Sequence, residues 1–416
     1  MKTDDSDLIA IGDARLQWVR QRMTVLAEVR ERLKASGALR DVRIGMALHT
    51  EAKTGMLALT LQEAGAEVSL TSCNPLSTDD CVAIALREKY GIDIYAKKGQ
   101  TTDEYYKSLN TVLDFGPEYI IDDGADLIFM LHTKRKDALS KVKGACEETT
   151  TGIHRLRAMA SEGVLAFPVM SVNDAMMKHL FDNRYGTGQS TFDGIMASTN
   201  LLIAGKRFVV AGYGWCGRGV AMRAKGMGAR VMVTEIDPVK AVEARLDGFD
   251  VAPMSEAVKQ ADFIVTTTGC KDVLRRESFE VMKDGCILAN SGHFDNEISK
   301  KDLQEISVST RSARENVTEY TLKNGRKIYL LAEGRLVNLA AGQGHPVEIM
   351  DMSFSLQALA VEHLAKHHEE LSPIVHLIPK ELDEWVARAA LRAMNVEIES
   401  LTEEQMKYLS GWREGT

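Results

Sequence analysis

Residues 206–237 read KRFVVAGYGWCGRGVAMRAKGMGARVMVTEID, and this stretch decides the fold. A short apolar run at 208–211 precedes the pattern G-x-G-x-x-G at 212–217. A helical stretch follows from 218 to 227, and a second apolar run ends at Glu235. Strand, glycine turn, helix, strand and acid, in this order, are typical of a dinucleotide-binding βαβ unit. We therefore predict a doubly wound α/β domain that binds a dinucleotide here.

Each special residue of this stretch has a physical reason. Gly212 permits the turn, Gly214 lets the backbone approach a pyrophosphate, and Gly217 lets the helix pack closely. The helix N-terminus offers N–H groups to the phosphates. Glu235 can accept both ribose hydroxyls and would repel a 2′-phosphate, so NAD is favoured over NADP. The alternatives are a tight turn that binds nothing and, for Cys216, a small packing residue.

Composition limits the class of protein. A length of 416 residues suggests two or three domains, and 45% hydrophobic and 26% charged residues are ordinary for a globular protein. The net charge of −8 and the lack of a basic run argue against a nucleic-acid partner. Six scattered cysteines without C-x-x-C fit reduced thiols in a cytosol. The start, MKTDDSDLIA, is not a signal peptide, and no apolar run is long enough for a membrane span, so we expect a cytoplasmic protein.

The N-terminal half alternates strands and helices. We expect an amphipathic helix over 14–36, strands at 42–48, 67–71, 92–96 and 119–121, and helices ending near 65 and spanning 79–89 and 103–113. This order predicts a parallel sheet. Polar clusters at 49–54, 72–80 and 122–126 follow the strands, so one cleft beyond their carboxyl ends can collect them.

The second half predicts an inserted domain. We expect a helix at 173–183 that starts at Asn173, a hinge-like loop at 185–191, a helix at 192–203, strands at 262–266 and 286–289, and a long helix at 349–369. A substrate-binding domain would comprise 1–183 and 345–384, and an NAD-binding Rossmann domain would comprise 184–344. Hinges near 183–190 and 342–346 would let the cleft close. Residues 385–416 would form a small helical segment for oligomerisation or for covering the cofactor.

Several titratable residues fall at the expected cleft. Lys178 and Asp182 are four apart on one helix face, and they form either a surface pair or a proton relay beside NAD. His293 follows a glycine at a strand end and is either structural or catalytic. His363 and His367 share the spacing of metal ligands but lack a visible ligand set, so no metal site is predicted. The residues alone indicate a two-lobed NAD protein, with a dehydrogenase as the default enzyme.

The chain resembles the S-adenosyl-L-homocysteine hydrolases from about residue 10 to 410. The motifs that carry the resemblance are SCNPLSTDD (72–80), DDGADL (122–127), CEETTTGIHRL (146–156), VNDAMMKHLFDNRYGTGQST (172–191), GYGWCGRGVA (212–221), TEIDP (234–238), GHFDNEI (292–298) and LAEGRLVNLAAGQGHPVEIM (331–350). The family implies a hydrolysis that uses redox chemistry: NAD oxidises the 3′-hydroxyl, which makes the C4′ proton acidic. A base removes that proton, homocysteine leaves, water adds, and the ketone is reduced again. A closed, dry cleft protects the intermediate.

The resemblance also implies roles for individual residues. The catalytic set would be His49, Asp123, Glu148, Lys178, Asp182, Asn183 and His293, with Lys178 and Asp182 handling the 3′-hydroxyl proton, Asn183 orienting them and Asp123 a candidate for the C4′ proton. His49 and His293 would handle the leaving thiolate and the attacking water. The set around tightly bound NAD would be Thr149, Thr150, Thr151, Gly212, Gly214, Trp215, Cys216, Gly217, Arg218, Gly219, Glu235, Lys240, Ser291, Gly292 and Asn338. Substrate would contact Glu51, Lys53, Thr54 and His345, the last at the base and homocysteine end.

Three departures from the family pattern are informative. Thr187 stands where some relatives have Cys. The chain ends soon after LTEEQMKYL and lacks the Lys and Tyr tail that many relatives extend into a neighbouring subunit. The stretch His49-Thr50-Glu51-Ala52-Lys53 resembles the H-x-E-x-K branch, some members of which prefer S-inosyl-L-homocysteine.

The residue types do not decide whether the substrate carries adenine or hypoxanthine. Glu51 and Lys53 can read the amino edge of adenine or the keto edge of hypoxanthine, and a mispaired edge costs a few kcal/mol. Alternatively, they pair with other protein groups and leave the purine to the backbone. Dual use is a third possibility.

Two other functions compete with the hydrolase. A non-catalytic NAD-binding regulator is disfavoured by the intact Asp123, Glu148, Lys178, Asp182 and His293. A simple NAD dehydrogenase would accumulate reduced cofactor, whereas the hydrolase recycles it. The family further implies a homotetramer.

Overall fold

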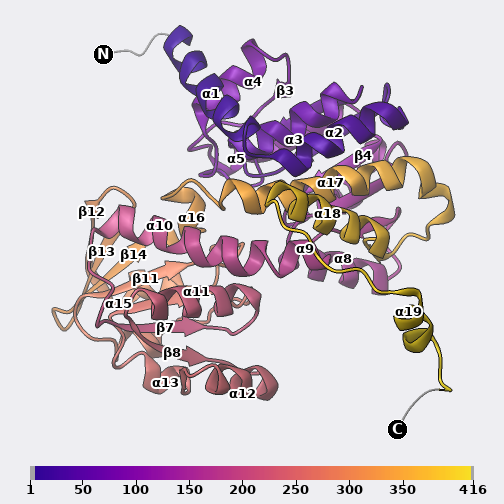
Figure 1. Ribbon diagram of the computed structural model, residues 1–416. Helices are drawn as coiled ribbons and strands as arrows, with labels where there is room; N and C mark the ends of the chain where they lie inside the picture. The colour runs from indigo at the N-terminus through magenta and orange to yellow at the C-terminus, as the bar shows by residue number, and fades with distance from the viewer. Residues whose placement is uncertain (1–4, 414–416) are drawn as a thin grey trace.

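Two sheets with helices on their faces build the protein (Figure 1). The computed structural model describes residues 5–413; Met1–Asp4 and residues 414–416, which belong to the expected N-terminal start and C-terminal segment, lie outside this range. Sheet A has seven strands in the order β15-β6-β5-β4-β1-β2-β3, and all its neighbours pair in parallel. Its strands are β1 Arg43–Ala47, β2 Glu67–Thr71, β3 Asp93–Ile94, β4 Tyr119–Asp122, β5 Gly144–Glu147, β6 Val169–Ser171 and β15 Val375–Leu377.

Sheet A is covered on its faces by helices from both ends of the chain. They are α1 Asp5–Arg20, α2 Thr24–Ser36, α3 Ala52–Glu63, α4 Asp80–Glu88, α5 Thr102–Asp114, α6 Asp126–Thr133, α7 Lys136–Leu139, α8 Thr150–Ser161, α9 Met176–His179, α17 Val347–His367 and α18 Lys380–Ala393. The long helix α17 contacts α2, α3 and β5, and its residues from Met350 to Glu362 are all buried. Because a helix buried all round stabilises a core from several sides, α17 fastens the C-terminal part of the chain to the N-terminal sheet.

Sheet B has eight strands in the order β12-β13-β14-β11-β10-β7-β8-β9. They are β7 Arg207–Ala211, β8 Arg230–Thr234, β9 Asp250–Val251, β10 Phe263–Thr266, β11 Cys286–Asn290, β12 Ser307–Arg314, β13 Val317–Leu322 and β14 Lys327–Leu331. The pairs β12–β13 and β13–β14 are antiparallel, and sequence analysis did not predict these three strands. Their turns contain Asn316 and Gly325 with positive φ angles of 60° and 83°, as tight hairpin turns require.

The helices around sheet B have between 4 and 13 residues. They are α10 Thr187–Thr199, α11 Trp215–Gly226, α12 Pro238–Leu246, α13 Met254–Ala257, α14 Arg276–Phe279, α15 Lys300–Ile306 and α16 Val337–Ala340. The chain enters this unit through a π-helix, Asp182–Gly186, that continues into α10, and it returns through residues 342–346 into α17. The unit is therefore inserted between the parts of the chain that build sheet A, while the domain bounds 1–183, 184–344, 345–384 and 385–416 stay predictions.

The predicted helix 14–36 is in fact two helices. α1 ends at Arg20 and α2 begins at Thr24. Asp351 of α17 accepts hydrogen bonds from the N–H groups of Val25 and Leu26 at 2.9 and 2.7 Å, so a distant carboxylate caps the second helix. The apolar period continues across the break, which is why the sequence did not show it.

The predicted hinge-like loop at 185–191 is helical. It belongs to the π-helix and to α10, while the expected helix at 173–183 is reduced to the short α9. The glycines there allow close approach instead of flexibility. A Cβ on Gly186 would lie 2.7 Å from Nδ1 of His345, and a Cβ on Gly188 would lie 2.7 Å from the carbonyl oxygen of Gly219.

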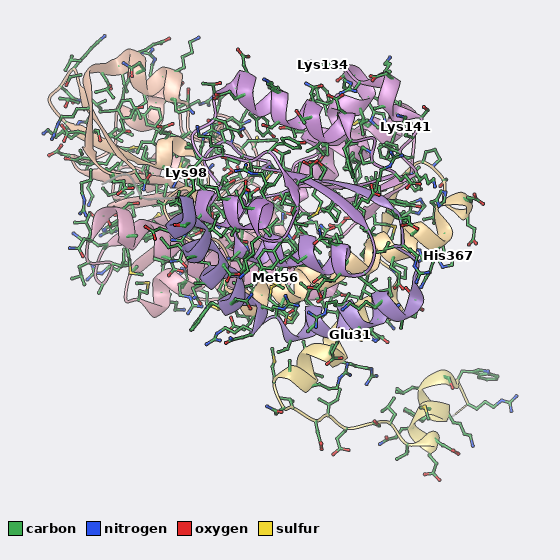
Figure 2. All side chains as sticks on the ribbon, turned by 90° about the horizontal axis from the view of Figure 1, so that it is seen from above. Glu31, Met56, Lys98, Lys134, Lys141 and His367 are labelled. Atoms are coloured by element: carbon green, nitrogen blue, oxygen red, sulfur yellow. The ribbon has the colours of Figure 1, made fainter. Side chains whose placement is uncertain are left out.

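The C-terminal segment extends away from the body (Figures 1 and 2). Its last helix, α19 Glu403–Ser410, buries none of its residues. Of the helices in the described range 5–413, none combines the length and the apolar character that crossing a membrane requires.

Candidate functional site

One cavity of about 1350 Å³ lies where the carboxyl ends of both sheets face each other. His49 follows β1, Asp123 follows β4 and Glu148 follows β5, so sheet A supplies one wall. Gly212 and Ser291 follow β7 and β11 of sheet B. Parallel α/β sheets bind ligands at this edge, and here two such edges share one cavity.

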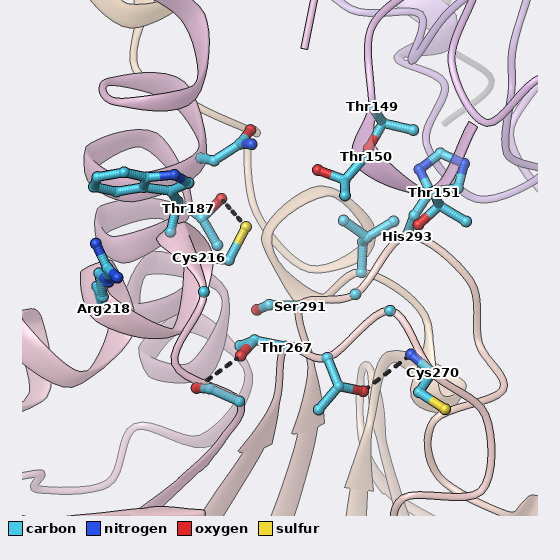
Figure 3. A pocket seen from close by; sticks show the side chains of 18 of the residues that line it. Thr149, Thr150, Thr151, Thr187, Cys216, Arg218, Thr267, Cys270, Ser291 and His293 are labelled. Atoms are coloured by element: carbon cyan, nitrogen blue, oxygen red, sulfur yellow. Dashed lines mark hydrogen bonds between the residues drawn. The ribbon is translucent and has the colours of Figure 1, made fainter. Parts of the chain in front are cut away.

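The sheet B wall has the features that a dinucleotide needs (Figure 3). An added Cβ on Gly217 would meet the carbonyl oxygen of Gly212 at 2.0 Å, whereas one on Gly214 would meet no atom within 4 Å. The lack of a side chain at Gly217 thus lets the start of α11 pack against Gly212, and Gly214 leaves open space beside its backbone. The N-terminus of α11 begins at Trp215 without a side-chain cap, so its N–H groups are available to phosphates.

The acid at the end of β8 is fixed by backbone N–H groups of the glycine turn and of the two residues that follow this acid. The Glu235 carboxylate accepts hydrogen bonds from the N–H groups of Tyr213, Ile236 and Asp237 at 2.6, 2.7 and 3.1 Å. It lines the cavity, where its remaining lone pairs suit ribose hydroxyls. Further along, Oδ1 of Asn338 is buried without a partner in the described part of the chain, although its Nδ2 donates to Ser190 at 3.1 Å. An orphaned acceptor beside the cavity fits the carboxamide N–H of a nicotinamide.

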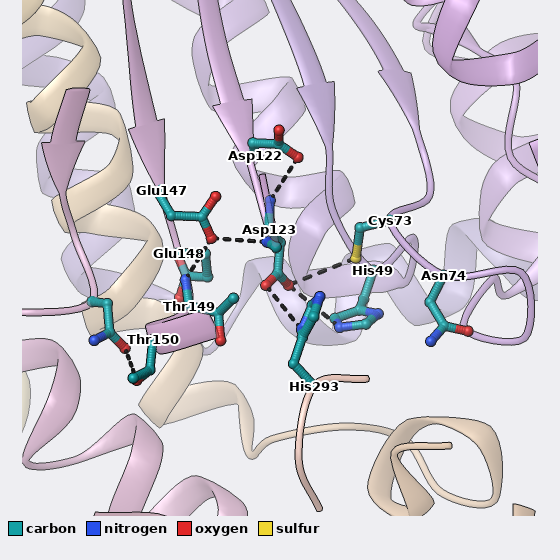
Figure 4. Close-up of polar contacts among 12 residues, drawn as sticks. His49, Cys73, Asn74, Asp122, Asp123, Glu147, Glu148, Thr149, Thr150 and His293 are labelled. Carbon is teal, nitrogen blue, oxygen red and sulfur yellow. Dashed lines mark hydrogen bonds and ion pairs between the residues drawn. The ribbon is translucent and has the colours of Figure 1, made fainter. Parts of the chain in front are cut away.

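On the sheet A wall, Asp123 lies between two histidines (Figure 4). Its carboxylate oxygens are 3.3 Å from Nε2 of His49 and 3.5 Å from Nδ1 of His293. Burial lowers the pKa of His49 to about 4, against the opposing effect of Asp123, so its imidazole is neutral at pH 7 and can accept a proton. Ser77 holds the other ring nitrogen of His49 at 2.7 Å. The three side chains form a buried base cluster whose members come from both lobes.

A second cluster surrounds Lys178. Its Nζ donates to Oδ1 of Asn183 at 2.8 Å and lies 3.7 Å from Glu148 and 3.8 Å from Asp182. Burial acts to lower the Lys178 pKa, but the two neighbouring carboxyl groups outweigh it, so the pKa is raised. Burial also raises the pKa of Glu148 to about 8, which keeps Glu148 protonated at neutral pH. The pair Lys178 and Asp182 is therefore buried beside the cavity, and the alternative of a solvated surface pair is wrong.

Asp182 differs from Glu148 in its charge. Burial acts to raise its pKa, but Lys178 and His345 outweigh this effect and lower the pKa below its ordinary value. Nδ1 of His345 lies 2.7 Å from Oδ1 of Asp182, and the hydroxyl of Ser353 donates to Oδ2 at 2.7 Å. Each oxygen of the anionic Asp182 thus has a cationic group or a hydrogen-bond donor beside it.

The residues expected at the purine pair with each other. Nζ of Lys53 lies 2.7 Å from Oε2 of Glu51 and donates to the carbonyl oxygen of Gln343 at 2.9 Å. Glu51 is also the N-cap of α3, because its carboxylate accepts from the N–H groups of Lys53 and Thr54. Both side chains line the cavity. Thr54 does not; its hydroxyl donates to the carbonyl oxygen of His49 at 2.5 Å and supports that loop.

Most of the predicted site residues line this one cavity. The lining residues among them are His49, Glu51, Lys53, Asp123, Glu148, Thr149, Thr150, Thr151, Lys178, Asp182, Asn183, Gly212, Gly214, Trp215, Cys216, Arg218, Glu235, Lys240, Ser291, Gly292, His293, Asn338 and His345. Thr54, Gly217 and Gly219 lie behind the wall. Gly219 is a packing glycine, because a Cβ there would lie 1.8 Å from the carbonyl oxygen of Arg184.

Sequence analysis missed the residues that support these side chains from behind. Gln357 of α17 donates to Glu148, and Asn173 accepts from Asn183 and Thr150 at 3.1 Å each. Glu147 accepts from the N–H groups of Gly124 and Thr149. A signal for Ser353 and Gln357 exists, since polar residues four apart inside an apolar helix require a buried partner.

Comparisons with known proteins agree with this geometry. The model of the S-adenosyl-L-homocysteine hydrolase family matches residues 1–140, and the model of its NAD-binding domain matches residues 183–344. The chain is 60% identical over 412 residues to an S-inosyl-L-homocysteine hydrolase of Methanocaldococcus jannaschii, covering 99% of both chains. It is 56% identical to an adenosylhomocysteinase of Pyrococcus abyssi, over 99% of this chain and 97% of that one. It is also 57% identical to an adenosylhomocysteinase of Aquifex aeolicus, over 99% of both. With NAD as its cofactor, the chain belongs to the S-adenosyl-L-homocysteine hydrolase family of enzymes.

Proposed function

We propose that the protein hydrolyses S-adenosyl-L-homocysteine to adenosine and L-homocysteine. The observation that supports this most directly is the arrangement of two proton-handling clusters in one cavity: Asp123 with its two histidines, and Lys178 with Asp182. A plain dehydrogenase needs only one such cluster, whereas oxidation followed by elimination and water addition needs a base at two different carbons.

The residues divide the work by position. Lys178 handles the proton of the 3′-hydroxyl, with Asp182 and Asn183 holding its ammonium in place. NAD, when bound, supplies the acceptor for the hydride and returns it at the end of the cycle. Glu148, protonated at neutral pH, can donate a hydrogen bond to a ribose oxygen.

The elimination half belongs to the other cluster. Asp123 is placed to take the C4′ proton once the neighbouring carbon is a ketone. His49 and His293 flank it, so the C4′ proton can pass from Asp123 to one imidazole, which gives it to the leaving thiolate and, neutral again, can activate the attacking water. Burial of these groups excludes bulk water from the reactive intermediate.

S-inosyl-L-homocysteine is the second candidate substrate. The relative with 60% identity carries that activity in its name. The Lys53 ammonium beside the cavity suits the O6 acceptor of hypoxanthine, and the Glu51 carboxylate suits its N1–H. The same pair can meet adenine in the opposite order, with Lys53 on N1 and Glu51 on the N6 amino group.

The deciding experiment is side-by-side chromatography of the products from both thioethers, with the free thiol counted. Adenosine release with the higher kcat/KM supports the first candidate, and inosine release supports the second. Absence of thiol from both would contradict hydrolysis and favour a non-catalytic NAD-binding regulator. We further propose a cytoplasmic homotetramer, which light scattering coupled to size-exclusion chromatography tests for assembly.

A further inference from the structure

Asp182 links two proton carriers through one oxygen atom. Oδ1 of Asp182 lies 2.7 Å from Nδ1 of His345 and 3.8 Å from Nζ of Lys178. The other oxygen, Oδ2, accepts from Ser353 at 2.7 Å, which fixes the rotation of the carboxylate. His345 therefore lies at the cluster of Lys178 and Asp182. Lys53, which we expect at the purine, donates to the carbonyl oxygen of Gln343, two residues before His345.

The partner of Nε2 of His345 is compatible with both the neutral and the charged imidazole. Its Nε2 lies 3.3 Å from Oγ1 of Thr187, and that hydroxyl also lies within 3.7 Å of Sγ of Cys216. When the imidazole is neutral with its proton on Nε2, this N–H donates to Thr187, whose hydroxyl donates to Sγ of Cys216, and Nδ1 is free to take a proton from Oδ1 of Asp182. When the imidazole is charged, Nε2 still donates to Thr187 and the new Nδ1–H donates to Asp182. Thr187 thus satisfies both states without moving the chain.

The chemistry of the cluster requires such a carrier. Lys178 is buried, and the Asp182 carboxylate beside it keeps it protonated, yet it must be neutral to receive the proton of the substrate hydroxyl. Resting on the proposed function, we propose that His345 accepts the proton of Lys178 through Asp182 before the 3′-hydroxyl is oxidised, and returns it after the final reduction.

The step balances in protons and electrons. An N–H bond of the Lys178 ammonium breaks and an N–H bond forms at Nδ1 of His345, with Oδ1 of Asp182 as the intermediate acceptor once Lys178 closes the 3.8 Å that separates the two atoms here. The O–H bond of the substrate then breaks toward neutral Lys178 while the hydride of the same carbon leaves to the bound cofactor. In the oxidised state Lys178 and His345 are both cationic, and Asp182 is the anion between them.

The location of His345 ties this relay to the connection between the two lobes. His345 lies in the returning segment 342–346, and its ring is in close contact with Gly186 in the entering π-helix. The titratable groups that face this region are Asp182 and Lys178, together with Glu148, His49 and the thiol of Cys216. The π-helix and the returning segment 342–346 both contact the imidazole. The relay is therefore complete only when these two connections between the lobes are packed as they are here.

The experiment is the 3′-oxidation of a nucleoside, adenosine or inosine, by the holoenzyme in a single turnover at several pH values. It is followed by absorbance at 340 nm. For His345→Ala we expect at least about a tenfold slower oxidation at pH 7, because a proton relay is lost. The defect should shrink as the pH rises and Lys178 can release its proton to solvent, and added imidazole should restore part of the rate. Thr187→Val should give a smaller defect of the same pH dependence, and Thr187→Ser should behave as the wild type.

Controls separate this proposal from others. His376→Ala, which changes a half-buried histidine of β15 that contacts Ser372, reports on non-specific loss, and bound NAD is measured after denaturation of each variant. A His345→Ala defect that is constant with pH and insensitive to imidazole would overturn the relay. So would normal oxidation with slow thiol release, which would put His345 at the homocysteine end. If the wild type releases thiol from neither thioether, the proposed function fails, while the oxidation assay still tests His345.

Discussion

Asp122 and Glu147 are direct partners in the parallel register of β4 and β5, and each immediately precedes a cavity acid, Asp123 or Glu148. Asp122 accepts hydrogen bonds from the N–H groups of Asp123 and Ile128 at 3.0 and 2.9 Å. Oε1 of Glu147 accepts from Gly124 and Thr149, which lie in two different loops, at 2.8 and 2.9 Å. One buried side chain therefore fixes the spacing of both loops that carry cavity acids.

Removing the Glu147 side chain, which joins the loops of Gly124 and Thr149, should destabilise the protein and displace the site. Glu147→Ala leaves two buried N–H groups without an acceptor, at a cost of about 1–3 kcal/mol for each. We expect a clear drop in Tm and a large loss of kcat. Burial raises the pKa of Glu147 well above its ordinary value and so favours the neutral form, and the neutral side chain of Glu147→Gln keeps an acceptor for both N–H groups and should come much closer to the wild type. If differential scanning calorimetry gave equal Tm values for the Ala and Gln variants, Glu147 would not stabilise the two loops through these hydrogen bonds.

Gln357 should control the pH range of activity. Its amide donates to Glu148, and this hydrogen bond lowers the pKa that burial has raised to about 8. Gln357→Met removes about 1 kcal/mol of stabilisation from the ionised form, which raises the pKa by roughly 0.7 unit. Because protonated Glu148 is the working form in our proposal, the alkaline fall of kcat/KM should move to higher pH.

The control for that shift is on the same helix. Ser355 is buried in α17, and its hydroxyl has no hydrogen-bond partner among the described residues, so Ser355→Ala should leave the pH profile unchanged. An unchanged profile for Gln357→Met, with altered kcat alone, would mean that Glu148 does not set the alkaline limb.

The two clusters should fail at different steps. Lys178→Ala should keep NAD bound but slow the 3′-oxidation, so no absorbance at 340 nm develops with nucleoside. With the thioether as substrate, Asp123→Asn should still oxidise the 3′-hydroxyl but lose elimination by about 10²–10⁴-fold, so reduced cofactor accumulates without thiol release. A Lys178→Ala variant with wild-type turnover would show that its assigned role is wrong.

The dinucleotide unit was predictable because its chemistry is local. The turn at Gly212, the open backbone at Gly214 and the acid Glu235 all lie within one βαβ unit of the sequence. The break before Thr24 was not predictable, since the carboxylate that caps α2 comes from Asp351, more than 300 positions away. The same holds for Gly186, whose role emerges only when His345 packs against it.

The site itself shows the same division. Family resemblance supplied the side chains that face the cavity, but not the supports Gln357, Ser353 and Asn173 behind them. It assigned Glu51 to the purine without revealing that Glu51 also caps α3. Contacts between distant segments decide these roles, and no local pattern encodes them.

Asp351 should make stability depend on pH. Burial raises its pKa to about 7, against the effect of the N–H groups of α2, while the unfolded chain has a value near its ordinary 3.8. Between these values the folded state binds the extra proton, so the contribution of Asp351 to stability falls as the pH rises from about 4 to 7. Asp351→Asn should therefore show a smaller loss of Tm between pH 5 and pH 8 than the wild type. Parallel curves for the two proteins would contradict this assignment.

The purine preference should depend on Lys53 more than on Glu51. Lys53 has three donor hydrogens, of which Glu51 and Gln343 use two, so one remains for an acceptor on the purine edge. Lys53→Met removes that donor and leaves the Glu51 carboxylate, within the described residues, with the amides of α3 as its partners. We expect kcat/KM for the preferred thioether to fall by about 10–100-fold, as for a buried hydrogen bond to a charged group, with a smaller fall for the other thioether. Glu51→Gln keeps an acceptor for the N–H groups of α3 and serves as the matched variant that separates helix capping from purine reading. If both variants lowered kcat/KM for the two thioethers by the same factor, the pair would be structural, and purine selection would rest with the backbone around Gln343.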